Sequence, residues 1–242
     1  MGILVIGGVI LLTIGLAILS HIQARKRRKE LAAWASARGF SFDPGEDGSL
    51  DVRYPGFSCL ERGDDRYGYN IMRGESGKLP FCAFDYHYET YSYDSKQRRQ
   101  THHHHFSAAV VEAGLPLKPL LIRGETIFDK VGEFLGFNDI DFESAEFSRR
   151  FCVKSPDRRW AFDVLHQGAM EFLLNSPLFD LEFQGRSVIA YRNGTFSPED
   201  FAAALAVNRG LLDLLPESVV DELKATGSSL SEQTTGDNMQ SQ

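Results

Sequence analysis

The first pattern along the chain is an apolar stretch, Ile3 to Ser20, that contains no charged residue. A helix of these 18 residues would span about 27 Å, close to the ~30 Å hydrocarbon core of a bilayer. Every residue from Arg25 to Lys29 is basic. A cleaved signal peptide carries its positive charge before the apolar stretch, so the observed order favours a retained transmembrane anchor over residues 1–22.

The basic run predicts the orientation of this anchor. Positive residues mark the cytoplasmic end of a membrane helix, so we expect a single-pass protein of the cell (plasma) membrane, with its N-terminus outside and its soluble domain in the cytoplasm. Each side chain at the membrane surface contributes about 1 kcal/mol near anionic headgroups. The residues expected there are Arg25, Lys26, Arg27, Arg28 and Lys29. A specific lipid site in this run is an alternative, although topology alone explains the charges.

Helical periodicity continues past the anchor. Leu31, Trp34 and Ala35 share one helical face, and Gly39 is a typical C-terminal stop. We therefore expect residues 23–39 to form a basic juxtamembrane helix that leads from the membrane into the domain.

Strand periodicity is clearest from Phe81 to Tyr93. Two sets of side chains alternate there, an apolar set and a polar set, which predicts one buried and one solvent-exposed face. The apolar set is Cys82, Phe84, Tyr86 and Tyr88, and the polar set is Asp85, His87 and Glu89. A polar turn over residues 94–99 leads into a second strand that ends at Ala108–Val111, so the two strands predict a β-hairpin.

The rest of the chain alternates short strands with helices. Turn residues and periodicity predict strands over 117–122, with Pro119 at an edge or a strand start, and over 142–153, and a short hairpin formed by 181–183 and 187–191. Helices are expected over 127–135, over 157–174 with a weak point at Gly168, and over 198–215, where Ser197-Pro198 is a strong start signal. A shorter helix to residue 224 is also expected.

These patterns predict an α+β fold: an N-terminal transmembrane helix followed by one domain of antiparallel β-hairpins covered by helices. With 43% apolar residues in 242, the chain is long enough for one domain with its own core, which we expect over residues 40–226. From Gly227 onward only Leu230 and Met239 are apolar, so residues 227–242 are expected to form a disordered tail.

Cysteine usage and charge narrow the class of protein. Cys59, Cys82 and Cys152 are odd in number and far apart, which argues for a reducing compartment and against a disulfide framework. Without the basic run, 21 of the 26 basic residues remain against 33 acidic ones, a net charge of about −12. A domain this acidic is repelled by phosphate backbones, so we expect no nucleic-acid partner.

Two segments carry a family resemblance. Phe147–Asp157, with the sequence FSRRFCVKSPD, is followed by Ala161, Leu165, Met170 and Leu173. This resembles a family of uncharacterised bacterial membrane-associated proteins, a domain of unknown function, in which a motif of the type EF-x-x-x-F-x-V-x-x-x-D precedes a helix containing Ala, Leu and Met. Phe84–Thr90 is similar to the family's aromatic strand. The resemblance covers about residues 83–174 and implies a bacterial source and a membrane context, but no activity and no functional residue.

The run His102-His103-His104-His105 is the one unusual cluster of chemical groups, and it is not part of that resemblance. A hairpin symmetric about the midpoint of residues 96 and 97 would place Glu89 opposite His104, with His87 as a neighbour on the same face. His87, Glu89, His102 and His104 would then form a ligand set for zinc or another transition metal. A register shifted by one residue would bring in His103 and His105 instead. The alternative is an ordinary polar surface with no cofactor.

Other chemistry is weakly represented. The chain has no Gly-rich phosphate loop with Lys, no GxSxG elbow, no HExxH motif and no pair of CxxC motifs, so no catalytic residue is predicted. Arg149-Arg150 and Arg158-Arg159 form a local basic cluster that could bind an anion or a membrane surface, although pairing with the domain's excess carboxylates is the favoured explanation.

The sequence thus favours a non-catalytic, membrane-tethered interaction or scaffold domain of the cytoplasm, with the lipid bilayer and an unidentified protein as partners. The main alternative is a metal-binding protein or metal-dependent enzyme that uses the histidine-rich hairpin. A lipid-responsive domain that uses the region from Arg149 to Arg159 is a third possibility.

Overall fold

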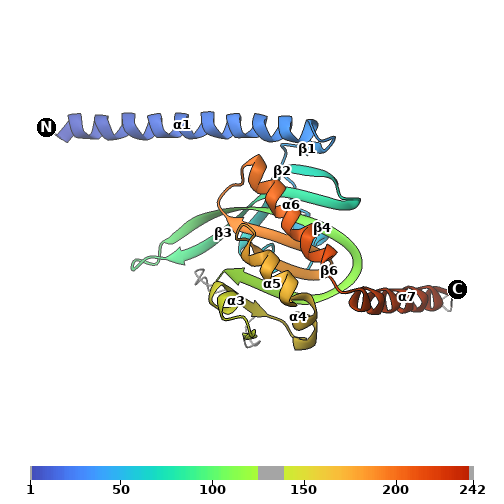
Figure 1. Ribbon diagram of the computed structural model, residues 1–242. Coiled ribbons are helices and arrows are strands. Elements are labelled where there is room, and N and C mark those ends of the chain that lie inside the picture. Colours follow the sequence, from blue (N-terminus) through green and yellow to red (C-terminus); the bar gives the residue numbers. More distant parts are fainter. Residues whose placement is uncertain (1, 125–138, 240–242) are drawn as a thin grey trace.

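The computed structural model describes residues 2–124 and 139–239, and within them the side chains of residues 18–124 and 139–228. It is an α+β structure in which a bent antiparallel sheet carries helices on its faces (Figure 1). The helix expected over 127–135 lies outside the described residues.

The first element is a single long helix, α1 (Gly2–Ser36), which joins the two segments expected at the N-terminus. Leu31 and Ala35 are fully buried against the domain, and Gly39, at a φ of +72°, follows the helix end as expected. Figure 1 shows the N-terminal part of α1 extending beyond the sheet. Within the described residues no helix is both long and apolar enough to cross a membrane. Most side chains of the expected anchor, Ile3 to Ser20, lie outside those residues.

The six strands form one antiparallel sheet in the order β1-β2-β3-β4-β5, and β6 also pairs with β4. The central strand β4 pairs with β3 through residues 99–111, with β6 through 106–122 and with β5 through 121–124. The strands are β1 (Ser41–Asp43), β2 (Asp64–Ser76), β3 (Leu79–Tyr93), β4 (Arg99–Gly124), β5 (Phe151–Lys154) and β6 (Asp180–Asn193).

The sheet has a hydrophobic core on each face. The larger core includes Trp160, Phe201 and Leu31, and it receives α1, α4, α5, α6 and α7. The smaller core is covered by α2 (Leu50–Arg53) and the loop after it, and it contains the predicted apolar face of β3, with Phe84 and Tyr86. The remaining helices are α3 (Ala145–Arg150), α4 (Arg158–Val164), α5 (Gln167–Leu174), α6 (Pro198–Asp213) and α7 (Glu217–Met239). Figure 1 shows α6 lying across the sheet.

Two predicted strand boundaries are in fact irregularities within long strands. β4 continues through Gly114 and Pro119, and β6 continues through Gly185, where the sequence predicts separate strands. The two strands keep the same partner on either side of these points, with the extra residues of β4 absorbed as bulges between Glu112 and Leu120. Gly185 has a φ of +60°, which allows β6 to pass the bulge without turning back.

The helices after residue 140 also differ in part from the prediction. The strand expected over 142–153 is the short helix α3 followed by β5, because Ser144 caps α3 by accepting a hydrogen bond from the Phe147 amide. The helix expected over 157–174 is divided into α4 and α5. The start of α6 is confirmed, since Ser197 and Asp200 form a capping box. The backbone of α7 continues to Met239, through the segment from Gly227 for which composition predicts disorder.

Candidate metal centre

The pairing of β3 with β4 decides which histidines face one another. Glu89 lies opposite His103 and His87 lies opposite His105, one residue away from the register with Glu89 opposite His104. The turn explains the difference, because it is a five-residue loop centred on Lys96. In this loop the Asp94 carboxylate accepts hydrogen bonds from the amides of Lys96 and Arg98, and the backbone of residue 97 is left-handed. The shifted register, open as an alternative in the sequence, is the one the chain adopts.

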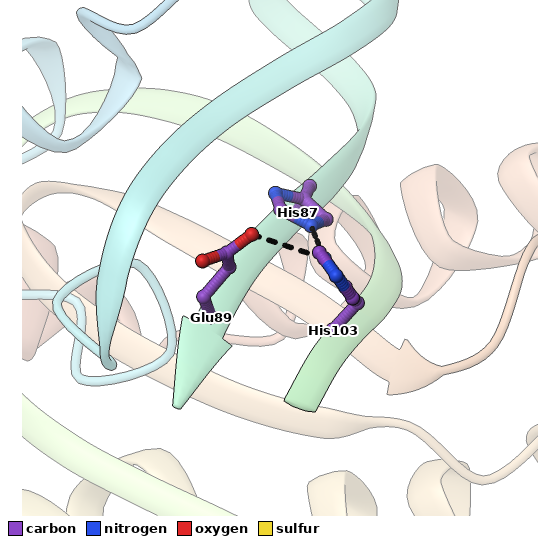
Figure 2. A group of neighbouring side chains, drawn as sticks. All are labelled: His87, Glu89 and His103. Carbon is purple, nitrogen blue, oxygen red and sulfur yellow. Dashed lines mark hydrogen bonds and ion pairs between the residues drawn. The ribbon is translucent and has the colours of Figure 1, made fainter. Parts of the chain in front are cut away.

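Three side chains of this face converge, as Figure 2 shows. Nδ1 of His103 lies 3.2 Å from Nε2 of His87 and 3.1 Å from Oε1 of Glu89. One donor atom from each of these residues lies within 4.8 Å of the other two. His87 and Glu89 come from β3 and His103 from β4, so the hairpin itself assembles the group.

His102 and His104 lie on the opposite face of the hairpin. Nε2 of His104 is 2.8 Å from the Thr90 hydroxyl, and its ring stacks on Tyr88 at 4.7 Å. Nε2 of His102 is 2.7 Å from the Ser92 hydroxyl. The ligand set expected from His102 and His104 together with Glu89 is therefore corrected to one that contains His103.

The surroundings of His87 fix its orientation. Its Nδ1 lies 3.2 Å from the carbonyl oxygen of Asp65, and the ring stacks on Tyr67 with centroids 4.6 Å apart. His105, on the same face, has its ring centroid 4.9 Å from that of His87 and its Nδ1 3.4 Å from the Tyr69 hydroxyl. Burial, together with the neighbouring His87 and His103, lowers the pKa of His105.

The polar face of β3 is not solvent-exposed as predicted. Asp85 is completely buried and His87 is 4% exposed. Asp85 is covered by Arg27 of α1, whose guanidinium makes two hydrogen bonds to the Asp85 carboxylate, at 2.6 and 2.8 Å, and two to the carbonyl oxygen of Phe196. Asn70 and Ser107 also donate to Asp85. A helix that is distant in sequence therefore covers Asp85, whereas His87 is enclosed by Tyr67 and the neighbouring histidines.

Within the basic run, Arg27 thus has a structural role. The side chain of Arg27 is 20% exposed, whereas Arg25, Lys26, Arg28 and Lys29 are all exposed. Lys26 makes only an exposed ion pair with Glu30, at 3.7 Å. For these four residues contact with a membrane surface stays a prediction, and for Arg27 the sequence held no signal of its inward role.

The second basic cluster is used largely within the domain. Arg150 donates to the carbonyl oxygens of Leu174 and Ser176, at the C-terminal end of α5. Arg159 lies 3.6 Å from Asp163 and 3.8 Å from Glu222. Of these two arginines only Arg159 pairs with carboxylates, as the charge-pairing interpretation expects, whereas Arg150 binds backbone carbonyl oxygens.

Sequence reasoning missed a buried carboxyl group, Glu182 of β6. It is 2% exposed and accepts hydrogen bonds from the Ser58 amide, the Ser58 hydroxyl and the Tyr191 hydroxyl. Burial raises the pKa of the Glu182 carboxyl, although the bonds from Ser58 and Tyr191 act against this. Strand alternation could have placed Glu182 on the face opposite Leu181 and Phe183. It could not have predicted that Glu182 is buried, because the loop near Ser58 packs over this side chain.

A solved structure has the same fold. The crystal structure of the mycobacterial trehalose monomycolate transport factor A, TtfA, matches this chain with a TM-score of 0.60 and 13% sequence identity. The match covers 79% of this chain and 95% of that chain. At this identity the likeness establishes the fold alone.

The sequence comparisons give no assignment. No family model matches the chain, and no curated protein matches it. Neither comparison supports the family resemblance, and the mycobacterial structural neighbour shares only the fold.

Proposed function

We propose that this chain is a non-catalytic accessory domain that is held at a membrane by α1. The observation that carries the proposal is the construction of α1: its first half contains the uncharged apolar stretch Ile3 to Ser20, and its second half is fixed to the domain. Leu31 and Ala35 are buried in the core, and Arg27 is bound to Asp85. A helix built in this way holds the domain in one orientation relative to whatever its apolar half enters.

The structural neighbour supports the accessory part of the proposal. TtfA is named as a transport factor for trehalose monomycolate, and it has the fold described above. A name of this kind describes a role in transport and specifies no covalent reaction. We accordingly propose that this domain meets a protein partner at the membrane, with the domain on the side of the basic run.

The first test is fractionation of cells that express the full chain. We expect the protein to sediment with membranes and to resist washing with high salt and alkaline carbonate. Leu11→Lys combined with Ile14→Lys should release it, because each lysine at the centre of a membrane helix costs about 2.5–3.5 kcal/mol. Lysines at two exposed apolar positions of the domain, Val52→Lys and Tyr93→Lys, form the matched control and should not release it.

Release of the unaltered chain by salt alone would contradict anchoring and leave only surface binding. For the accessory role, cross-linking on intact membranes should give a defined adduct with another membrane protein. The adduct should disappear in the variant with lysines at positions 11 and 14. A chain that gives no adduct under any condition would contradict the interaction role.

A further inference from the structure

We propose that His87, Glu89 and His103 bind one Zn²⁺ ion at the end of the β3–β4 hairpin. The proposal is independent of the accessory function, since it rests only on these three side chains and their surroundings. It differs from the set expected from sequence in that His103 replaces His102 and His104.

The contacts of His87 leave the correct atom available for a metal. The Asp65 carbonyl oxygen can only accept a hydrogen bond, so the Nδ1 that faces it at 3.2 Å carries the proton. In a neutral imidazole the lone pair is then on Nε2, and Nε2 is the atom that faces His103. A hydrogen bond from the far ring nitrogen to a backbone carbonyl is the usual support of a metal-binding histidine.

Two of the three distances between ligand atoms suit a tetrahedral ion, and the third, between His87 and Glu89, is within 4.8 Å. Zinc bonds of about 2.0–2.1 Å to nitrogen and oxygen place neighbouring ligand atoms roughly 3.3 Å apart. The two separations that involve His103 Nδ1 are 3.2 Å, to His87, and 3.1 Å, to Glu89. In the absence of a metal, a single Nδ1 proton on His103 can be shared between these two acceptors. With zinc bound, all three atoms offer lone pairs to one centre.

Burial is graded across the site. His87 is 4% exposed, the Glu89 side chain 15%, and the His103 side chain 60%. Two ligands are thus held rigidly by the sheet and the third lies toward solvent. Two imidazoles and one carboxylate leave a fourth position of the tetrahedron, which water or an incoming ligand can occupy from the solvent side.

The competing explanation for any metal binding is the run of four histidines, which could bind ions loosely whatever the fold. The structure separates these explanations, because His102 and His104 face away from Glu89, toward Ser92 and Thr90. Substitutions within one short run therefore distinguish a built site from an adventitious one.

The experiment uses the full chain in detergent micelles, purified through a tag without histidine and stripped of metal. Zn²⁺ is titrated against a chromophoric chelator, and Co²⁺ provides a visible spectrum that reports four-coordinate geometry. We expect one equivalent to bind. His103→Ala should weaken binding by at least about 100-fold, since loss of a partner outside the ligand set already costs 10–100-fold. The matched control His102→Ala/His104→Ala should stay within about twofold.

Because His103 is the most exposed ligand, its substitution should leave the fold intact, and the circular dichroism of each variant checks this. Zinc should raise the melting temperature of the unaltered chain and of the control, but not of His103→Ala. The absence of zinc binding would overturn the proposal. Equal loss in His103→Ala and in the His102/His104 control would also overturn it, and would assign the metal to the histidine run.

Discussion

At the scale of single residues, the ion pair between Arg27 and Asp85 stands out. Asp85 is fully buried and accepts from Arg27, Asn70 and Ser107, so its charge is compensated by several donors. Arg27 is held in turn by the carbonyl oxygen of Phe196, which precedes α6. The pair therefore connects α1, the sheet and the start of α6 through one guanidinium group, whose planar fork fits the carboxylate in two bonds.

Loss of one partner of the ion pair between Arg27 and Asp85 should destabilise the fold. We expect Asp85→Ala to lower the free energy of unfolding by about 3–5 kcal/mol, because Arg27 is left half-buried without its counter-ion. Arg28→Ala, at the exposed neighbouring position, should change it by no more than about 0.5 kcal/mol. Denaturant unfolding of the full chain in micelles, followed by tryptophan fluorescence, measures both. Equal effects of the two substitutions would contradict the structural role of the pair.

Glu182 predicts a pH dependence of stability. Its pKa in the folded chain is raised above the ordinary value of 4.5 by burial, so folding favours the protonated form. The stability it contributes is fully present below about pH 4.5 and is lost as the pH rises through the folded pKa. Relative to Glu182→Gln, which does not titrate, the unaltered chain should become less stable from about pH 4.5 upward. Denaturation midpoints of both proteins across this range test the sign, and a constant difference would contradict it.

At the scale of elements, the sequence predicted local signals well and pairings poorly. The capping box of α6, the stop at Gly39 and the apolar face of β3 each depend on residues close in sequence, and all three are present. Gly185 and Pro119 were interpreted as a turn and a strand boundary, because such residues usually interrupt strands. Long-range pairing of β4 with β6 keeps both strands continuous across these positions, and no local sequence pattern predicts this pairing.

The same reasoning explains the histidine cluster. The residue types and the hairpin were predictable from the sequence, but their register depends on a five-residue turn whose geometry is set by Asp94 and residue 97. A shift of one residue exchanges the faces of all four histidines. The ligand set was therefore identifiable only as one of two alternatives.

Gly185 provides a test of the continuous strand β6. A Cβ atom added there would have no neighbour within 4 Å, so a substitution acts through the backbone alone. At a φ of +60°, Gly185→Ala should destabilise the fold by about 1–2 kcal/mol, and Gly185→Asn should cost less, since Asn tolerates this conformation. Unfolding midpoints give the ranking. Equal stability of all three proteins would show that this backbone conformation is not required.

At the scale of the whole molecule, the sheet is covered on both faces, which explains why so many of its polar residues are buried. The sequence indicated the apolar face of β3 but not that α1 would cover Asp85 on the other face. Amphipathic patterns show which face of an element is apolar. A polar face can also be buried when the helix that covers it supplies a side chain of opposite charge, as Arg27 does for Asp85. The shared fold with TtfA at 13% identity shows that this architecture tolerates extensive sequence change.

The central position of β4 has a consequence for folding during translation. Phe106 of β4 pairs with Asn193 of β6. One edge of the longest strand therefore stays unpaired until nearly the whole domain has been translated. During that interval the nascent chain presents open backbone amides and carbonyls, the kind of edge that recruits other strands. A chain truncated before β6 begins at Asp180 would leave this edge uncovered and would be a substrate for chaperones and quality-control proteases.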